Sequence, residues 1–314
     1  MLPAVRHVRP CLRLWPVATC LVAAWSLAGC SSPPAADASG VVQVVGAENE
    51  YANVASQIGG SYVHVSAIMS NPNTDPHTFE ASPTVAQVVS AAQLVIQNGV
   101  GYDTFMDKIE AAAANPVRKV IDVQGLLGLP NTTPNPHLWY SPTTMPAVAR
   151  AIADDLSALE PSDASRFRAN LTEFDNSLQP WLADIAALKE AYGGAGVATT
   201  EPVADYLLRA AGLDNLTPFV FQADIMNGVD PSPQDVTVEK NLFVDHQVKV
   251  FVYNQQVTDS FTSSLAALAR SRGIPVVGVY ETMPAPGYDY QSWMVAEVHA
   301  LQMALSRGVS TTRL

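Results

Sequence analysis

Short apolar runs alternate with amphipathic stretches along the chain from residue 41 onward. The apolar runs have the length of buried strands, while the stretches between them repeat apolar residues at three- and four-residue steps, which is typical of helices. Strands separated by single helices favour βαβ units and a parallel sheet. In the first part of the chain we expect strands at 41–46, 63–69, 94–97 and 117–122, and helices at 51–58, 84–92 and 102–114.

A long helical region follows this first alternation. One helix is expected at 143–159 and a second at 162–192, ending at Gly193-Gly194. At about 1.5 Å per residue the second helix would extend about 45 Å, which is long enough to brace two lobes. Pro180 lies inside it, so we expect a kink or a short break there.

The alternation then returns for the rest of the chain. We expect strands at 197–200, 219–221, 248–254 and 275–280, and helices at 201–211, 233–243, 261–272 and 291–305. The predicted fold class is therefore α/β, with two lobes that each hold a mainly parallel four-stranded sheet flanked by helices. The predicted domain limits are 41–160 for the N-terminal lobe, 161–194 for the linking helix and 195–314 for the C-terminal lobe.

The first 40 residues have the layout of an export signal and a tether. Three arginines precede an apolar run at 14–25, which is too short to span a membrane comfortably. The run closes on Leu27-Ala28-Gly29-Cys30, which resembles the lipobox of bacterial lipoproteins, where cleavage precedes a lipidated cysteine. We expect a signal peptide at 1–29, lipidation of Cys30 and a flexible tether at 30–40. A cleaved signal peptide with a coincidental cysteine is the simpler alternative.

Composition narrows the possible functions. All three cysteines, Cys11, Cys20 and Cys30, lie in the first 30 residues. We therefore expect no disulfide framework, no cysteine-ligated metal and no cysteine nucleophile in the folded part. Removal of residues 1–29 changes the net charge from −12 to −15, because three arginines are lost. An acidic protein of this kind repels nucleic acids and attracts cations.

Two Pro-His motifs are the strongest candidates for chemistry. His77 follows Asp75-Pro76 after an expected strand, and His137 follows Asn135-Pro136. Proline fixes its own φ and restricts the preceding residue, so each motif holds its histidine on a stiff loop. Because ligands of parallel α/β sheets bind at the carboxyl ends of the strands, both imidazoles are expected at that edge. A single Pro-His would more simply be a surface turn, but a pair is a better signal.

Two carboxylates occupy corresponding positions in the second lobe. Glu201 follows the expected strand at 197–200 and Glu281 follows the one at 275–280. Glu201 could simply be a helix-start charge, and Glu281 could be a solvated loop carboxylate. Together with His77 and His137 they would form a four-ligand site for a divalent cation. Asn254-Gln255-Gln256 could orient these carboxylates, whereas His64, His246 and His299 look like ordinary surface or packing residues.

These motifs resemble those of the zinc/manganese solute-binding lipoproteins of bacterial ABC transporters (cluster A-I, family 9 metal-binding proteins). The resemblance rests on Asp75-Pro76-His77-Thr78-Phe79-Glu80-Ala81-Ser82-Pro83, Asn135-Pro136-His137-Leu138-Trp139-Tyr140, Thr200-Glu201-Pro202 and Tyr280-Glu281-Thr282. It implies two α/β lobes joined by one long helix, with the metal between them. It also implies His77, His137, Glu201 and Glu281 as ligands, with Asp289 as the reserve candidate for the fourth position.

The function implied is capture of Mn²⁺ or Zn²⁺ outside the cytoplasm and delivery to a membrane permease powered by separate ATPase subunits. A glutamate at the third position favours Mn²⁺, although Zn²⁺ generally binds such sites more tightly and Fe²⁺ is also compatible. We expect a lipid-anchored monomer that is not an enzyme. The alternatives are a secreted metal-dependent hydrolase and a lipoprotein adhesin. The hydrolase would need an open coordination position, and the sequence has no His-Glu-x-x-His, Gly-x-Ser-x-Gly or phosphate-loop motif.

Overall fold

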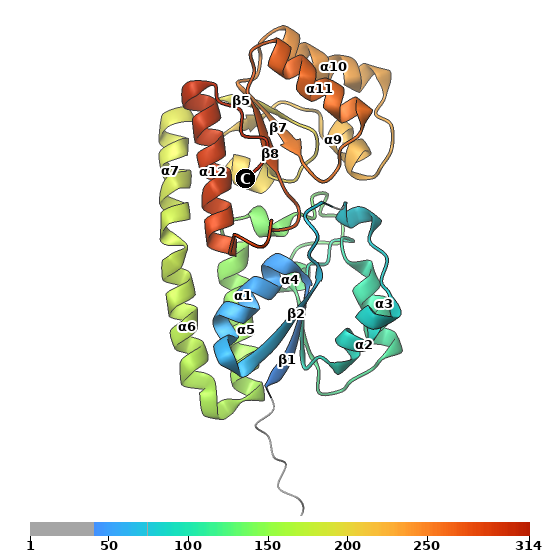
Figure 1. Cartoon of the computed structure of the whole chain (residues 1–314), viewed down its shortest axis with the longest axis vertical. Helices are drawn as coiled ribbons and strands as arrows, with labels where there is room; N and C mark the ends of the chain where they lie inside the picture. The colour runs from blue at the N-terminus through green and yellow to red at the C-terminus, as the bar shows by residue number, and fades with distance from the viewer. Residues whose placement is uncertain (1–40, 74) are drawn as a thin grey trace, which may run out of the picture. The chain divides into compact units, whose positions relative to one another are not determined.

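The computed structural model describes residues 41–73 and 75–314 (Figure 1). The expected signal peptide, the lipidation site at Cys30 and the tether lie outside the described residues. Among the residues it does describe, no helix is both long and apolar enough to cross a membrane.

The first sheet contains four parallel strands in the order β2-β1-β3-β4. Their bounds are β1 (Val42–Glu48), β2 (Val63–Met69), β3 (Leu94–Gln97) and β4 (Lys119–Asp122). Side chains alternate between the two faces, so Val44 and Val45 contribute to different clusters of buried residues. One face is covered by α1 (Asn49–Gly59) and α5 (Thr144–Leu159), and the other by α2 (Pro83–Ala91) and α3 (Thr104–Ala112). A short helix, α4 (Val123–Leu126), follows β4.

The second sheet repeats this arrangement with the order β6-β5-β7-β8, again all parallel. Its strands are β5 (Gly196–Thr199), β6 (Asp214–Asn215), β7 (Val250–Asn254) and β8 (Val276–Val279). One face packs against α9 (Phe219–Met226), α10 (Pro233–Val244) and α11 (Ser260–Ser271). The other face is covered by α7 (Gln179–Tyr192), α8 (Asp205–Ala210) and α12 (Tyr290–Arg307). The predicted fold class of two parallel four-stranded sheets flanked by helices is confirmed.

The strand expected at 219–221 is wrong, because these residues form the start of α9. Phe219 and Val220 are 40% and 60% exposed, whereas Phe221 and Ile225 are buried in the same cluster. Buried side chains four residues apart lie on one face of a helix. Burying that face outweighs the preference of the three bulky residues 219–221 for a strand. The fourth strand of this sheet is instead the two-residue β6.

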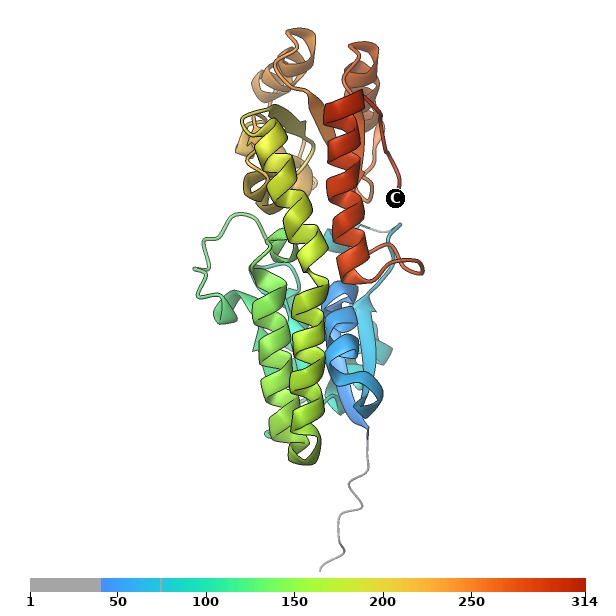
Figure 2. The ribbon, with the colours of Figure 1, turned by 90° about the vertical axis from the view of Figure 1, so that its left-hand side faces the viewer.

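The long helix expected at 162–192 is present as two helices, α6 (Ala164–Ser177) and α7, separated only by Leu178. Pro180 occupies the first turn of α7, where its missing N–H costs no helical hydrogen bond. The break predicted at this proline is therefore confirmed. Figure 2 shows α6 and α7 following each other past both sheets, with α12 beside α7.

Three tryptophans pack where the helices meet the sheets. Trp139, Trp181 and Trp293 are fully buried in one cluster that draws residues from both sheets. The Tyr290 hydroxyl donates to the Trp139 carbonyl over 2.7 Å, which ties α12 to the loop that carries His137. Large buried aromatic rings dominate core energetics, so these three rings help to hold the two sheets together.

Candidate metal centre

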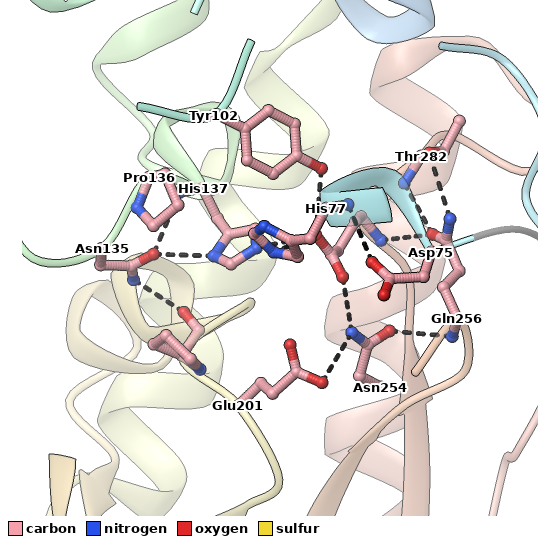
Figure 3. Close-up of polar contacts among 12 residues, drawn as sticks. Asp75, His77, Tyr102, Asn135, Pro136, His137, Glu201, Asn254, Gln256 and Thr282 are labelled. Carbon is pink, nitrogen blue, oxygen red and sulfur yellow. Dashed lines mark hydrogen bonds and ion pairs between the residues drawn. The ribbon is translucent and has the colours of Figure 1, made fainter. Parts of the chain in front are cut away.

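The site lies beyond the carboxyl ends of strands from both sheets, and Figure 3 shows His77, His137 and Glu201 gathered there. His77 lies in the loop after β2, while Glu201 and Glu281 follow β5 and β8 directly. His137 immediately precedes a 3-10 turn, Leu138–Tyr140. In parallel α/β sheets ligands bind at this edge, because the loops that follow the strands are not hydrogen-bonded into the sheet. The structure thus brings the predicted residues to one region from four separate loops.

The loop around His77 is held by its own side chains. Pro76 begins a 3-10 turn, Pro76–Thr78, and the Asp75 carboxylate accepts a 2.8 Å hydrogen bond from the His77 backbone N–H. The His77 side chain is 20% exposed, whereas those of His137 and Glu281 are fully buried. Among these three, His77 therefore forms the solvent-facing side of the site.

One carboxylate oxygen is the centre of the cluster. Glu281 Oε2 lies 3.1 Å from His137 Nε2 and also 3.1 Å from His77 Nε2. The contact with His77 is close but does not have the geometry of a hydrogen bond. Ligand atoms of His77, His137 and Glu281 all lie within 4.8 Å of one another. Two imidazole nitrogens and a carboxylate at such spacing can surround a single divalent ion.

The tautomer of His137 follows from its neighbours. The Asn135 side-chain N–H donates to the Pro202 carbonyl over 2.7 Å, so the Asn135 oxygen must be the acceptor. That oxygen lies 2.8 Å from His137 Nδ1, so Nδ1 carries the hydrogen. In a neutral imidazole Nε2 then presents a lone pair toward the Glu281 carboxylate. Two lone pairs at 3.1 Å require a proton or a cation between them.

Electrostatics around the three groups favour a cation. Burial lowers the pKa of His137, which keeps this imidazole neutral near pH 7. Burial also lowers the pKa of His77, but the adjacent Glu281 carboxylate outweighs it and raises that pKa overall. For Glu281, burial raises the pKa, but hydrogen bonds and charge from His137 and His77 lower it further when an imidazole holds the shared proton, so the carboxylate is the ionised partner. The site therefore combines a fixed negative charge with imidazole lone pairs.

Glu201 is next to this cluster but outside the group of three. It is 2% exposed, and its Oε1 accepts a 3.2 Å hydrogen bond from the Asn254 side chain. Its Oε2 is buried and has no hydrogen-bond partner among residues 41–73 and 75–314. Burial and the charge of Glu281 raise the pKa of Glu201 well above its usual range. A buried carboxylate oxygen without a donor is available to a cation.

Asn254 and Gln256 hold the two carboxylates of the second sheet. Asn254 Nδ2 donates to Glu281 Oε1 at 2.7 Å as well as to Glu201. The Asn254 oxygen accepts from the Gln256 backbone N–H, and the Gln256 side-chain oxygen accepts from the backbone N–H groups of Glu281 and Thr282. The orienting role expected for the 254–256 segment is confirmed for both residues. Such outer contacts fix the geometry of metal ligands.

Tyr102 is the residue that sequence reasoning missed. Its hydroxyl donates to Glu281 Oε2 over 3.0 Å, and its ring packs edge-on against His77 and His137. In the sequence it was visible only as the start of an expected helix. Its position directly after Gly99-Val100-Gly101, at the carboxyl end of β3, was the available signal.

The remaining candidates lie elsewhere. Asp289 caps the N-terminus of α12, where its carboxylate accepts from the Ser292 backbone N–H. His64 and His246 are exposed, and His299 forms an exposed ion pair with Asp184. None of these four belongs to the group of metal-compatible side chains found in the described part of the chain.

Comparison with known proteins gives a consistent result. Residues 44–304 match the family described as ZnuA, zinc-uptake complex component A periplasmic. The manganese-binding lipoprotein MntA of Bacillus subtilis is 28% identical over 170 residues, which cover 52% of this chain and 55% of that protein, about half its length. The high-affinity zinc uptake system protein ZnuA of Haemophilus ducreyi is 23% identical over 221 residues, covering 61% of this chain and 70% of that protein.

A solved structure shares the fold. The solute-binding protein FpvC of Pseudomonas aeruginosa, in complex with Mn²⁺, superposes with a TM-score of 0.71 at 20% identity, over 86% of this chain and all of that one. At this identity the likeness establishes the fold alone. The family match, in contrast, extends over most of the chain, and the protein therefore belongs to the ZnuA family of periplasmic metal-binding proteins.

Proposed function

We propose that the protein is the extracytoplasmic solute-binding component of a metal-importing ABC transporter. It captures one divalent ion, Mn²⁺ or Zn²⁺, between the two sheets and delivers it to a membrane permease whose ATPase subunits are separate chains. The observation that carries the proposal is the pair of imidazole Nε2 atoms of His77 and His137, both 3.1 Å from Glu281 Oε2. Asn135 fixes the tautomer of His137, so a proton or a cation must lie between its Nε2 and Glu281, and a bound metal ion meets that need.

The proposed ligands are His77, His137, Glu201 and Glu281. Ligand atoms of His77, His137 and Glu281 already lie close enough together to share one ion. Glu201 completes the set by turning its carboxylate from Asn254 toward the ion, which gives its unpartnered oxygen a ligand role. Two nitrogen and two oxygen donors suit both Mn²⁺ and Zn²⁺, and the second carboxylate favours Mn²⁺ relative to an all-nitrogen site. Named relatives include both a manganese-binding and a zinc-uptake protein.

The domain layout belongs to the same proposal. The limits 41–160, 161–194 and 195–314 place one sheet in each lobe and α6 and α7 in the link. The ion would then sit where the lobes meet and be released when docking on the permease alters that junction. We propose that the chain acts as a monomer and has no catalytic activity of its own. Four protein ligands would close the coordination shell that a metal-dependent hydrolase keeps open, and the family match favours neither that alternative nor an adhesin.

Metal content tests this function directly. The full-length chain, purified in detergent without added metal and then given equal Mn²⁺ and Zn²⁺, is expected to hold one equivalent by mass spectrometry. Glu201→Ala is expected to lose most of it, because one charged donor disappears from a buried site. Glu190→Ala, which removes an exposed carboxylate on α7, is the matched control and should retain it. Equal metal content in wild type and Glu201→Ala would contradict the proposal that Glu201, from the second lobe, is a metal ligand.

The proposed membrane anchor has its own test. Cys30→Ala removes the thiol that lipidation needs, so the variant is expected to move from the membrane pellet to the soluble fraction of cells. Immunoblotting of the two fractions measures the shift. Cys20→Ala, a change inside the expected signal segment, is the control and should leave the protein in the pellet. A Cys30→Ala protein that still sediments with membranes would contradict a lipid anchor at this residue.

A further inference from the structure

A polar cavity separate from the metal centre lies at the carboxyl edge of the first sheet, beyond β3 and β4. It has a volume of about 330 Å³ and is lined mainly by acids and amides. Here it is called the acidic pocket, and its polar side chains are Gln97, Thr104, Asp103, Asp107, Asp122, Gln124 and Asn131. No lysine, arginine or histidine lines it among the described residues. It shares no residue with the proposed ligand set of the metal centre.

Two oxygens from neighbouring residues of the acidic pocket have no donor among the described residues. Gln97 and Asp122 are register partners on β3 and β4, so they lie side by side at the strand ends. Gln97 is 8% exposed, and neither its Oε1 nor Asp122 Oδ1 accepts a hydrogen bond from any part of the chain that the structure describes. Leaving a buried acceptor unsatisfied costs free energy, so a donor or a cation is needed at both atoms.

The orientation of both groups is fixed by their other atoms. Gln97 Nε2 donates to Asp107 Oδ1 over 3.1 Å, so the amide cannot be reversed without losing that bond. Asp122 Oδ2 accepts from the Gly125 backbone N–H over 3.1 Å. A Cβ on Gly99 would lie 2.5 Å from Asp122 Oδ1, so this oxygen lies directly against the backbone of the loop after β3. The two free oxygens are therefore held in place rather than mobile.

Charge decides which kind of partner fits these oxygens. Both oxygens of Asp103 are engaged by the backbone N–H groups of Asn98 and Gly99, at 2.6 and 2.9 Å. Burial raises the pKa of Asp103 to about 6, which still leaves it ionised at neutral pH. Asp107 and Asp122 add two further carboxylates with no base in the pocket. Several negative groups around unpartnered oxygens attract a cation, and a donor set of oxygens alone suits a hard one.

We propose that the acidic pocket binds a hard divalent cation, with Ca²⁺ as the best-fitting ion, through Gln97 Oε1, Asp122 Oδ1 and the Asp107 carboxylate. Ca²⁺ accepts irregular oxygen geometry and completes its shell with water, whereas Mg²⁺ needs a near-octahedral site. With few protein ligands, the affinity is expected at a Kd of about 10⁻⁴–10⁻³ M, as in extracellular calcium modules. Bound there, the ion would fasten the end of β3 and the start of α3, which flank the loop that carries Tyr102, to the end of β4.

Calcium titration tests this site independently of the proposed transport function. The full-length protein is stripped of metal and titrated with CaCl₂ by calorimetry. Wild type is expected to bind one Ca²⁺, and Asp122→Asn to lose at least about tenfold in affinity, because the substitution removes a charge from the ion's shell. Asp245→Asn, which neutralises an exposed carboxylate after α10, is the matched control and should bind as wild type does.

Two further measurements separate this site from the transition-metal centre. His137→Ala should leave Ca²⁺ binding unchanged, and Asp122→Asn should keep its Mn²⁺ binding, which also shows that the variant folds. Absence of a binding heat up to 10 mM CaCl₂, roughly ten times the upper expected Kd, would overturn the proposal. So would Ca²⁺ binding that survives in Asp122→Asn or disappears in His137→Ala. If the proposed transport function fails and Ca²⁺ binding still depends on Asp122, the present inference stands.

Discussion

Replacing His137 by alanine is expected to reduce the affinity for Mn²⁺ and Zn²⁺ by more than about 100-fold. Changes to residues that only orient a ligand typically cost about 10–100-fold, and His137 is a proposed ligand that is fully buried and already fixed by Asn135. Its loss removes a nitrogen donor and leaves the Glu281 carboxylate with one imidazole fewer. Calorimetry with a competing chelator measures the change.

His77→Ala is expected to cause a similar loss, since its Nε2 lies at the same distance from Glu281. His64→Ala is the matched control, because His64 is an exposed histidine on β2 and should bind as wild type does. Equal losses in all three variants would mean that the changes act through stability, and the ligand assignment would be withdrawn. Thermal unfolding of the metal-free variants provides the necessary comparison.

The fold could be predicted from the sequence because apolar periodicity reports burial directly. Strands such as 94–97 and 276–279 are buried on both faces, which makes them apolar runs except for Gln97 and Gly278. Prediction failed at 219–221, where only one of three bulky residues faces the core. A short run cannot distinguish a strand from a helix turn when the exposed residues are also apolar.

The site was predictable only where a motif marks a loop. Pro76 and Pro136 point to stiff loops before the two imidazoles, and Asn254 follows a strand that the sequence identifies. The bond from Tyr102 to Glu281 joins residues 179 positions apart. No local pattern encodes such a contact, because it depends on how the two sheets face each other. The unpartnered oxygen of Gln97 also depends on tertiary packing, in this case the packing of β3, β4 and α3 within the first lobe.

Acidification is expected to weaken metal binding strongly. The ion must displace every proton that its ligands carry, so the apparent affinity falls about tenfold per pH unit below each ligand's pKa. The pKa of His77 is raised, so its competition begins above the ordinary histidine value of about 6.5. The pKa of His137 is lowered, so it contributes only at more acidic pH. Glu201, whose pKa burial and the Glu281 charge raise, adds to the loss.

These pKa shifts predict that metal affinity falls gradually with pH rather than in a single step. Between pH 7.5 and 5.5 the affinity for Mn²⁺ is expected to fall about 10- to 100-fold, with a slope that steepens as His137 begins to take up protons. Glu281 contributes nothing to the slope, because the two histidines keep it ionised throughout. His77→Ala should bind weakly but with a shallower pH dependence, since one competing proton is gone, whereas His64→Ala should follow the wild-type curve. An affinity that stays constant over this range would mean that neither imidazole coordinates the ion.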